Sequence, residues 1–429
     1  MRWMKVLAGL VVGLLVLAGC GGGSDRTKAQ IRLVNASQAY AQLDFRFDND
    51  LRQSQVGYGA TDGYVDVDPG KTASISSSGS AGFLRSFVPT LSAKKHYTVL
   101  AFGAAGDLRQ QVLDEDVGAP DTNRSLLRVV NAAPDAGTLD VYLLGSTESL
   151  TTAVPVQEDA GYATLGSWIT LNSGTWGVKV TLANSKTDIR LELSALALAS
   201  KQVVTLVLTP SEGGVMVHAL VLTQQSPVLR QDARHARVRL AALVGDSASV
   251  AASVGSVTLA AGVASPVVGE YQLVPVGLSA VTAAANAQSL AAASVTLAAG
   301  RDYTLMVHGA FAGPRVGWLD DDNRLPADLT RAKLRLVNAR AVNSAALAMS
   351  LDALPLTTTA VAVGSASLPF EATPTTGVGN SNGVLSVTAS GATAPLFSAT
   401  GQVFEASRVY SVFVFEPQAQ GQSIVRRDR

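Results

Sequence analysis

The chain of 429 residues contains a single cysteine, Cys20, which is the one thiol that could be covalently modified. Arg2 and Lys5 precede an apolar run over residues 6–17, and small residues stand directly before the cysteine. A charged start, a short hydrophobic stretch and small residues before a cleavage point are typical of a secretory signal peptide. The apolar run is too short for a transmembrane helix, which needs about 20 residues. The pattern therefore predicts an exported protein with cleavage at Cys20.

The Leu-Ala-Gly-Cys ending of this segment resembles a bacterial lipobox. The resemblance implies a signal peptide over residues 1–19, lipid on the thiol and amine of Cys20, and a membrane anchor at that residue. Burial of acyl chains gains roughly 0.8 kcal/mol per CH₂, so two or three chains hold where one is marginal. In residues 20–29 three glycines follow Cys20, and this segment is expected to form a flexible tether. Gly21 is not the aspartate that usually marks inner-membrane retention, so the expected location is the cell envelope, on the outer membrane; an uncleaved signal anchor is the alternative.

A second grouping with chemical potential is Gly245-Asp246-Ser247, which resembles the nucleophile block of Gly-Asp-Ser esterases. Those enzymes also carry an Asp-x-x-His pair, and Asp232 and His235 have that spacing. The order differs, because the family's histidine follows its serine by a long stretch, whereas here it precedes Ser247 by twelve residues. We therefore interpret the grouping as a turn in which Asp and Ser bond their own backbone. No catalytic residue is predicted, and an esterase-like hydrolase with this site in the third repeat is the alternative function.

Metal-ligating patterns are weak. Histidines 96, 218, 235 and 308 show no spacing that would hold zinc, so they are expected to be strand histidines that are hydrogen-bonded or partly exposed. Four acidic groups could supply oxygen ligands to calcium, but none has the spacing of the twelve-residue loop with its closing glutamate. These groups lie at 44–50, 62–68, 114–121 and 320–322. The last two groups are interpreted as solvated segments where the chain leaves a domain. An adhesin stalk stiffened by calcium at these segments is a further possibility. No metal or cofactor is predicted.

The bulk composition excludes some classes of partner. Lys plus Arg and Asp plus Glu both number 33, and removal of Arg2 and Lys5 with the signal leaves 31 − 33, or −2. A nearly neutral chain without a basic run does not attract nucleic acid over long range. No cysteine remains after lipidation, so no disulfide can brace the exported fold, and its stability must come from apolar burial.

An internal repeat predicts the architecture. The string Ile31-Arg32-Leu33-Val34-Asn35-Ala36 returns at residues 127–132 and 334–339, with a weaker copy at 238–243. The arginines stand at 32, 128, 239 and 335, in steps of 96, 111 and 96. A period near 100 is too long for a solenoid repeat and has the size of one β-sandwich domain. Each arginine is expected to pair with an acid on its own sheet face or to shield an edge strand.

Two further strings recur in each unit and are expected to form strands. One has an aromatic residue six positions before a glycine, at Tyr64, Trp168 and Tyr271, with Pro369-Phe370 in its place in the fourth unit. The other begins at residues 96, 203, 302 and 409. The recurring aromatics are expected to pack in the cores, whereas Trp176 and Trp318 have no counterparts and are candidates for a ligand surface. Residues 281–300 are alanine-rich and favour a helix locally, but the register of the repeat favours strands.

The run Arg-Val-Val-Asn-Ala-Ala-Pro-Asp-Ala at 128–136, followed by Leu139-Asp140-Val141-Tyr142, resembles the bacterial family known as domain of unknown function 4397. The resemblance is good for unit two, fair for units one and four, and poor for unit three. It implies exported or lipid-anchored proteins with tandem copies of an immunoglobulin-like fold, and it supplies no catalytic residues.

These observations predict an all-β protein of four tandem immunoglobulin-like sandwiches after a cleaved lipoprotein signal. The expected boundaries are 30–121, 122–232, 233–329 and 330–429. The expected role is that of a non-catalytic envelope lipoprotein acting as a surface spacer or a binding and adhesion module. The loops at Pro134-Asp135 and Gly245-Asp246 are the candidate binding loops, because function in such domains is carried by loops on a rigid frame. The expected partners are the membrane, through lipidated Cys20, and an envelope protein or a polysaccharide.

Overall fold

The computed structural model describes residues 27–378, 382–415 and 422–429, so Cys20 and the predicted signal peptide lie outside the described residues. The described part of the chain contains strands and one short 3₁₀ helix, η1 (Pro134–Ala136), but no α-helix. Its sheets form four successive two-layer sandwiches, here named units 1 to 4, built from β1–β8, β9–β17, β18–β28 and β29–β38. This confirms the predicted fold class of four tandem immunoglobulin-like sandwiches, while the boundaries assigned to them remain a prediction.

Unit 1 consists of two four-stranded sheets, and its core lies between them. The first sheet has the order β4 (Val65–Val67), β1 (Ala29–Asn35), β7 (His96–Ala104), β8 (Asp107–Asp114). The second has the order β3 (Asp50–Gly57), β2 (Gln42–Phe47), β5 (Ala73–Ser77), β6 (Phe83–Phe87). β1 and β7 pair in parallel, and all other pairs are antiparallel.

Unit 2 repeats this plan with one additional strand. Its first sheet has the order β12 (Ile169–Asn172), β9 (Arg124–Asn131), β15 (Val203–Pro210), β16 (Val217–Thr223), β17 (Val228–Gln231). Its second sheet has the order β11 (Gln157–Ala160), β10 (Leu139–Leu144), β13 (Gly174–Leu182), β14 (Ser185–Leu198). The parallel pair of the first sheet is β9 with β15.

Units 3 and 4 keep the same arrangement, with parallel pairs β18–β27 and β29–β37. The first sheet of unit 3 contains β21 (Val267–Val268), β22 (Gln272–Pro275), β18 (His235–Val244), β27 (Asp302–Gly309) and β28 (Arg315–Asp321). Its other strands are β20 (Val257–Ala264), β19 (Ser249–Val254), β24 (Val281–Ala285), β25 (Gln288–Leu290), β23 (Gly277–Ser279) and β26 (Val295–Leu297). The first sheet of unit 4 contains β32 (Phe370–Ala372), β29 (Ala332–Asn338), β37 (Arg408–Phe415) and β38 (Gln422–Arg427). Its other strands are β31 (Leu354–Pro355), β30 (Leu347–Leu351), β34 (Leu385–Ala389), β35 (Phe397–Ala399), β33 (Thr375–Thr376) and β36 (Val403–Phe404).

The three recurring strings therefore form equivalent strands, as predicted. The alanine-rich segment 281–300 is also extended, with β24 paired to β19 and β25, so the prediction of strands rather than a helix is confirmed. Alternate side chains of this segment, such as Val281, Ala283 and Ala285, are buried in the unit 3 sandwich. Burial on one face of a sheet thus outweighs the local helix propensity of alanine.

A tyrosine corner supports the immunoglobulin-like character of units 1, 3 and 4. In each, a tyrosine hydroxyl accepts a hydrogen bond from the backbone N–H five residues earlier. The pairs are Tyr97 with Ser92 at 3.0 Å, Tyr303 with Ala298 at 3.1 Å, and Tyr410 with Glu405 at 3.0 Å. Immunoglobulin-like domains use such a bond to fix the corner before a central strand. Unit 2 has Val204 at this position in its register.

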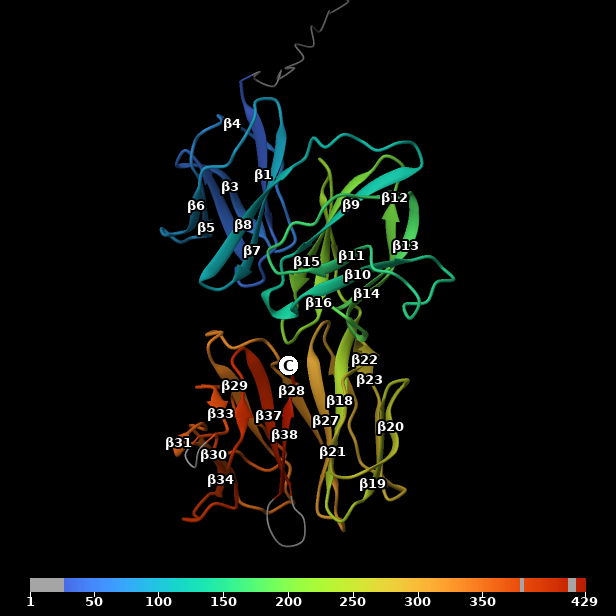
Figure 1. Cartoon of the computed structure of the whole chain (residues 1–429), viewed down its shortest axis with the longest axis vertical. Helices are drawn as coiled ribbons and strands as arrows, with labels where there is room; N and C mark the ends of the chain where they lie inside the picture. The colour runs from blue at the N-terminus through green and yellow to red at the C-terminus, as the bar shows by residue number, and fades with distance from the viewer. Residues whose placement is uncertain (1–26, 379–381, 416–421) are drawn as a thin grey trace, which may run out of the picture.

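The units pack in two pairs, which Figure 1 shows one above the other. Units 1 and 2 meet through the outer faces of their first sheets, where Val34, Leu100 and Phe102 join Val130 and Val207 in one buried apolar cluster. Units 3 and 4 meet in the same way through a second cluster that includes Leu243, Met306, Val337 and Phe413. The first sheets are therefore buried on both faces.

The fifth strand of unit 2, β17, carries the chain from one pair to the other. β16 runs away from the junction between the pairs, and the antiparallel β17 returns along it, with Leu222 opposite Val228 and Ala219 opposite Gln231. β18 can then start at this junction and run in the same sense as β9 along the molecule, from the waist to the far end of unit 3 (Figure 1). The region where the two pairs meet is named the waist.

Candidate functional site

The recurring arginine of each unit lies on the outer face of its first sheet, at the interface within a pair. Its Nε donates a hydrogen bond to a hydroxyl on the neighbouring parallel strand in all four units. The bonds are Arg32 to Thr98 at 2.9 Å, Arg128 to Thr205 at 2.9 Å, Arg239 to Thr304 at 2.9 Å, and Arg335 to Ser411 at 2.7 Å. All four arginines are buried.

The recurring aromatic residues stack on these arginines. The ladders place Val65 opposite Ile31, Ile169 opposite Leu127 and Gln272 opposite Val238, so each preceding aromatic faces the following arginine. The guanidinium carbon lies 4.7 Å from the ring centroid for Arg32 and Tyr64, 4.2 Å for Arg128 and Trp168, and 4.6 Å for Arg239 and Tyr271.

The prediction that these aromatics pack in the sandwich cores is therefore wrong. They are half-buried on the opposite face of the sheet, where a ring can cover a buried cation. In unit 4 the equivalent position falls on Pro369, because Phe370 lies opposite Leu334.

An acid completes this arrangement in three units, and the sequence predicted such an acid without identifying its position. Glu115, Asp321 and Asp428 each accept a hydrogen bond from the same hydroxyl that the arginine contacts. Each acid stands 17 residues after its hydroxyl residue, a constant spacing that could have revealed it. In unit 2 the position equivalent to the acid is Gln224. It stands two residues after Leu222, the residue that pairs with Thr205.

The predicted pairing of each arginine with an acid of its own sheet is thus confirmed for three units. Arg32 lies 3.5 Å from Glu115, Arg239 lies 3.8 Å from Asp321, and Arg335 lies 4.0 Å from Asp428. Arg128 has no carboxylate within ion-pair distance among the described residues, and burial lowers its pKa to about 10. Arg239 also bonds Asp428 at 2.5 Å and Arg335 bonds Asp321 at 2.6 Å, so the acids of units 3 and 4 are exchanged across their interface.

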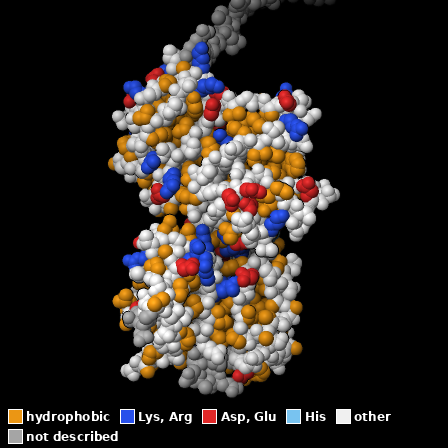
Figure 2. All heavy atoms as spheres, viewed as in Figure 1, with side chains coloured by type: hydrophobic (Ala, Val, Ile, Leu, Met, Phe, Trp, Pro, Cys, Tyr) orange, Lys and Arg blue, Asp and Glu red, His pale blue; other side chains and the backbone are white. Residues whose placement is uncertain are grey.

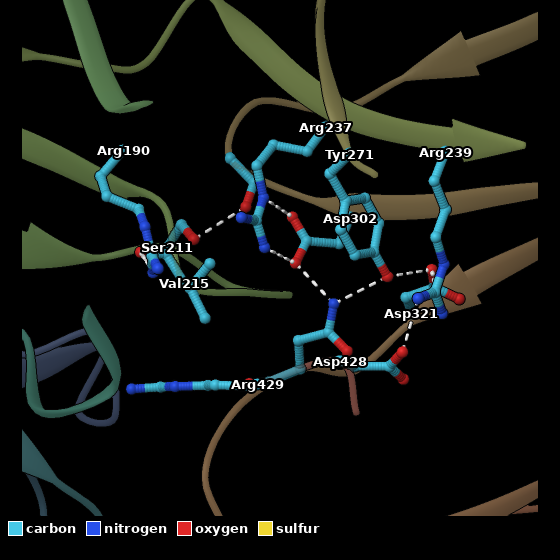
Figure 3. A network of polar contacts seen from close by, with 12 residues as sticks. Arg190, Ser211, Val215, Arg237, Arg239, Tyr271, Asp302, Asp321, Asp428 and Arg429 are labelled. Carbon is cyan, nitrogen blue, oxygen red and sulfur yellow. Dashed lines mark hydrogen bonds and ion pairs between the residues drawn. The ribbon is translucent and has the colours of Figure 1, made fainter. Parts of the chain in front are cut away.

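This arrangement continues into a polar network that crosses the waist (Figure 3). Arg237 of unit 3 forms a bidentate pair with Asp302, at 2.8 and 2.6 Å, and reaches Asp188 of unit 2 at 3.4 Å. Asp188 is itself held by Arg190, at 2.8 and 2.7 Å. Burial opposes ionisation of Asp188, but the two arginines outweigh burial and lower its pKa.

The network extends from Asp302 to the unit 3–unit 4 interface. The amide of Asn323 donates to Asp302 at 2.8 Å and to the hydroxyl of Tyr271 at 2.9 Å. The Tyr271 hydroxyl in turn donates to Asp321 at 2.6 Å. Burial raises the pKa of Tyr271, so the phenol stays protonated and able to donate. Buried charges are thus paired from unit 2 through unit 3 to unit 4.

The waist also contains a cleft of about 610 Å³, which is the candidate binding site. Equivalent loops of units 1 and 2 line one side of it, and the last strand of unit 3 with the chain that follows lines the other. The lining residues include Gln38, Gly103, Pro134, Asp135, Glu212, Arg301, Asp320, Asp322 and Arg324. Figure 2 shows acidic and basic side chains gathered along the waist, with further charged side chains scattered over the faces above and below it.

Charged groups in the cleft are held by fixed partners. Asp135 accepts a hydrogen bond from the backbone N–H of Leu325 at 2.7 Å and lies 3.7 Å from Arg429. Burial opposes ionisation of Asp322, but bonds from Arg324 and Lys333 outweigh it and lower its pKa to about 2. The cleft therefore presents ionised carboxylates next to guanidinium groups, a lining suited to hydrogen-bonding a polar ligand.

Of the two predicted binding loops, the structure places one in this cleft. Pro134 and Asp135 form η1 and line it. Gly245 and Asp246 lie instead at the far end of unit 3, in the exposed turn between β18 and β19, where Asp246 and Ser247 have φ values of 58° and 54°. This position agrees with the interpretation of Gly-Asp-Ser as a turn.

The esterase-like residues are not brought together. His235 and Ser247 lie at opposite ends of β18, and a strand of this length separates its ends by about 30 Å. Asp232 bonds Arg230 at 2.6 Å. No catalytic triad is formed by these three residues, since a triad requires mutual hydrogen-bond contact.

The next candidates are two histidines and two tryptophans. His218 and His308 lie on strands, with Nδ1 of His218 accepting from Ala233 at 3.0 Å and Nδ1 of His308 3.2 Å from the Arg340 carbonyl, as predicted for strand histidines. Trp176 and Trp318 are half-buried and pack against the cores of units 2 and 3, and a ligand surface that includes them stays a prediction.

No cluster of three or more acidic, histidine or cysteine residues able to hold a metal occurs in the described residues. Glu115 and Asp321, from two of the acidic groups, are bound instead to the arginines described above. No helix within the same residues is long and apolar enough to cross a membrane.

The fold and the repeated outer-face arginines define a class of tandem immunoglobulin-like proteins with paired domains. The chain belongs to the family of Domain of unknown function (DUF4397), whose model matches residues 29–142 and 236–352. This confirms the resemblance predicted from sequence. Each match begins at the first strand of a pair, on β1 and on β18, and unit 3, the poorest copy, lies within the second match.

Comparison with other proteins adds little. No protein of curated function matches the chain significantly. Among solved structures, a family 26 carbohydrate-binding module of Eubacterium rectale Amy13K in complex with maltoheptaose has 10% identity and a TM-score of 0.16, over 46% of this chain and 97% of that one. The Bacillus anthracis TIE protein has 7% identity and a TM-score of 0.15, over 90% of this chain and 67% of that one. A putative cell adhesion protein from Bacteroides uniformis has 9% identity and a TM-score of 0.15, over 72% and 100%. At these TM-scores the similarities carry no functional argument.

Proposed function

We propose that this protein is a non-catalytic lipoprotein of the cell envelope, a rigid body that presents a polar binding cleft away from its anchor. One observation supports this most directly. The four units are joined by interfaces with apolar clusters within pairs and by a buried ionic network between pairs, so the cleft at the waist is framed by fixed elements. Sites on a rigid frame of this kind bind ligands with little ordering cost.

The proposed anchor is lipidated Cys20, on the outer membrane. Support comes from the lipobox-like sequence and from the position of Ala29, the first residue of β1, at the end of unit 1 remote from the waist (Figure 1). Cys20→Ser is expected to move the protein from the envelope fraction to the soluble fraction and to remove the acyl mass from its N-terminus. A variant that stays in the envelope without acylation would contradict the proposed anchor.

The proposed partner is a polysaccharide or another envelope protein that contacts the waist cleft. Carboxylates and guanidinium groups side by side can accept from and donate to hydroxyl or amide groups. A pull-down from envelope extract with residues 21–429 as bait tests this. Asp135→Asn, at the cleft, should weaken capture, and Asp246→Asn, on the remote turn of unit 3, is the matched control. Equal capture by both variants would place binding elsewhere.

The same preparation tests the alternative hydrolase. Esterase activity of the purified protein that disappears in Ser247→Ala would overturn the non-catalytic proposal. We expect no activity dependent on Ser247, because His235 lies at the other end of β18.

A further inference from the structure

A second cavity, of about 530 Å³, lies between units 3 and 4 at the end of their pair that faces away from the waist. Its walls are mostly small apolar side chains, with His308 and Arg315 of unit 3 as the charged or titratable groups. The remaining lining residues are Val316, Val342, Asn343, Ser344, Ala346, Ala362, Val363 and Gly364. Its size falls in the range of small-molecule sites.

The repeat identifies the counterparts of these residues in units 1 and 2. His308 and Phe102 each stand five residues after the corner tyrosine of their unit, Tyr303 or Tyr97. Arg315 lies opposite His308 in its ladder. Arg109 lies opposite Phe102 in the same way. His308 and Arg315 therefore occupy the positions that Phe102 and Arg109 occupy in unit 1.

In the first pair, a tyrosine from unit 2 packs against Phe102 and Arg109 of unit 1. The ring of Tyr162 meets that of Phe102 edge to face, with centroids 6.0 Å apart. The guanidinium carbon of Arg109 lies 5.0 Å from the Tyr162 ring centroid. Unit 2 thus inserts an aromatic ring between an aromatic residue and an arginine of unit 1, an arrangement favoured by edge-to-face and cation–π contact.

Unit 4 has no ring at the equivalent position. A backbone hydrogen bond aligns the two units. The N–H of Ala163, which follows Tyr162, donates to the carbonyl of Asn131 in unit 2, and the N–H of Gly364 donates to the carbonyl of the equivalent Asn338 in unit 4. The counterpart of Tyr162 is therefore Val363. The second pair therefore keeps the two side chains that could contact an aromatic ring, His308 and Arg315, but has a valine where the first pair has a tyrosine.

The two pairs also differ in whether this arginine has an acidic partner. Arg109 is paired with Asp107 at 3.0 Å, whereas the residue two positions before Arg315 is Gly313. Among the described residues, no carboxylate lies within ion-pair distance of Arg315. Nδ1 of His308 faces the Arg340 carbonyl at 3.2 Å and must donate to it, which makes Nε2 the hydrogen-bond acceptor of the neutral ring. The pocket thus combines a place for a ring with an unpaired cation and an acceptor.

We propose that this pocket binds a small aromatic carboxylate, whose ring lies between His308 and Arg315 as that of Tyr162 lies between Phe102 and Arg109, and whose carboxylate pairs with Arg315. The binding involves no covalent step. It depends neither on the lipid anchor nor on the waist cleft, so failure of either leaves it standing.

The test uses residues 21–429 and isothermal titration with 4-hydroxyphenylacetate, with cyclohexylacetate and acetate as comparisons. We expect saturable one-to-one binding of 4-hydroxyphenylacetate, at least tenfold tighter than that of cyclohexylacetate, and no saturation by acetate. Val363→Tyr restores the tyrosine of the first pair and should abolish binding. Val154→Tyr, which adds the same ring at an exposed position of unit 2, is the matched control and should bind as the parent does.

Arg315→Gln provides a second test that does not alter the packing, because Arg315 is exposed. We expect at least a tenfold loss of affinity for 4-hydroxyphenylacetate. Absence of binding by the parent protein, equal binding of cyclohexylacetate, or unchanged affinity in Val363→Tyr or Arg315→Gln would each overturn the proposal.

Discussion

At the scale of single residues, the buried asparagine of the first strand explains why its string recurs. Asn131 is fully buried, and its amide donates to the carbonyls of Gly137 and Ala160, both at 2.9 Å. Its side-chain oxygen accepts from the N–H of Ala133 at 3.1 Å. One side chain thus satisfies three backbone groups that would otherwise be buried without partners, each at a cost of about 1–3 kcal/mol.

We therefore expect Asn131→Ala to lower the free energy of unfolding by about 3 kcal/mol or more. Urea denaturation followed by circular dichroism measures this. Asn172→Ala is the control, since this residue is exposed at the end of β12 and should change stability by less than about 0.5 kcal/mol. In unit 3, Ala242 stands in place of this asparagine. There the hydroxyl of Ser265 accepts from the N–H of Val244 and donates to the carbonyls of Ala242 and Val244, which satisfies backbone groups of the same strand.

The buried histidines predict a stability that falls in mild acid. Burial lowers the pKa values of His218 and His308, so the folded chain protonates these side chains less readily than the unfolded chain, in which histidine titrates near pH 6.5. Below that pH the unfolded chain binds more protons, and the free energy of unfolding therefore decreases as the pH falls from about 6.5. Denaturation at pH 7.5 and 5.5 measures the decrease. His218→Gln should reduce the difference, and Asn172→Ala, an exposed change without a titratable group, should not.

At the scale of strands and sheets, units 2 and 3 offer a comparison of buried arginines with and without acids. Arg128 is covered by Trp168 and has no carboxylate partner, whereas Arg239 is bound to Asp428 and lies near Asp321. A buried ion pair can often be replaced by apolar groups at little cost, but removal of one partner leaves an uncompensated charge.

Arg239→Met is accordingly expected to destabilise by about 3–5 kcal/mol. Arg128→Met should cost much less, because no acid is left unpaired. Thermal and urea unfolding of the two variants, which remove the same side chain from equivalent strands, provide the comparison. Equal losses would show that the acids contribute nothing to the interface.

The strands themselves were largely predictable, because Ile31, Leu127 and Leu334 open near-identical strings. Their partners across each pair were not, since Val34 and Val130 lie on the outer face of their sheets and period-2 patterning is lost where both faces are buried. Of the residues that line the waist cleft, the sequence singled out Pro134-Asp135 as a binding loop and the acidic group 320–322 as a domain exit. The other contacts of the waist come from loops and from residues such as Asp188 that have no repeated pattern.

At the scale of the whole molecule, two kinds of interface join the four units. Within pairs an apolar cluster forms the centre of the interface, and in the second pair buried arginines and acids are exchanged beside it. Between pairs, Arg237 and Asp188 form part of an ionic network. Reversal of one charge in that network should therefore separate the pairs without unfolding them.

Asp188→Lys places a third cation beside Arg190 and Arg237, so we expect the radius of gyration in small-angle X-ray scattering to increase while the β-sheet circular dichroism is retained. Glu158→Lys, an exposed change on β11 of the same unit, is the control and should leave the radius unchanged. An unchanged radius in Asp188→Lys would show that apolar contacts, such as that of Leu273 with the unit 2 core, hold the waist alone.

The hairpin of β16 and β17 determines the reach of the molecule. Because the chain doubles back there, the second pair extends the first end to end, and two tiers of strands about 30 Å long give a height of about 60 Å. If the N-terminus is anchored as proposed, the turns at Gly245 and Val342 would stand farthest from the lipid surface. Without the four residues of β17 (Val228–Gln231), unit 3 would start beside the anchored end of unit 1, and the distance from the lipid surface to its far turn would fall by about half.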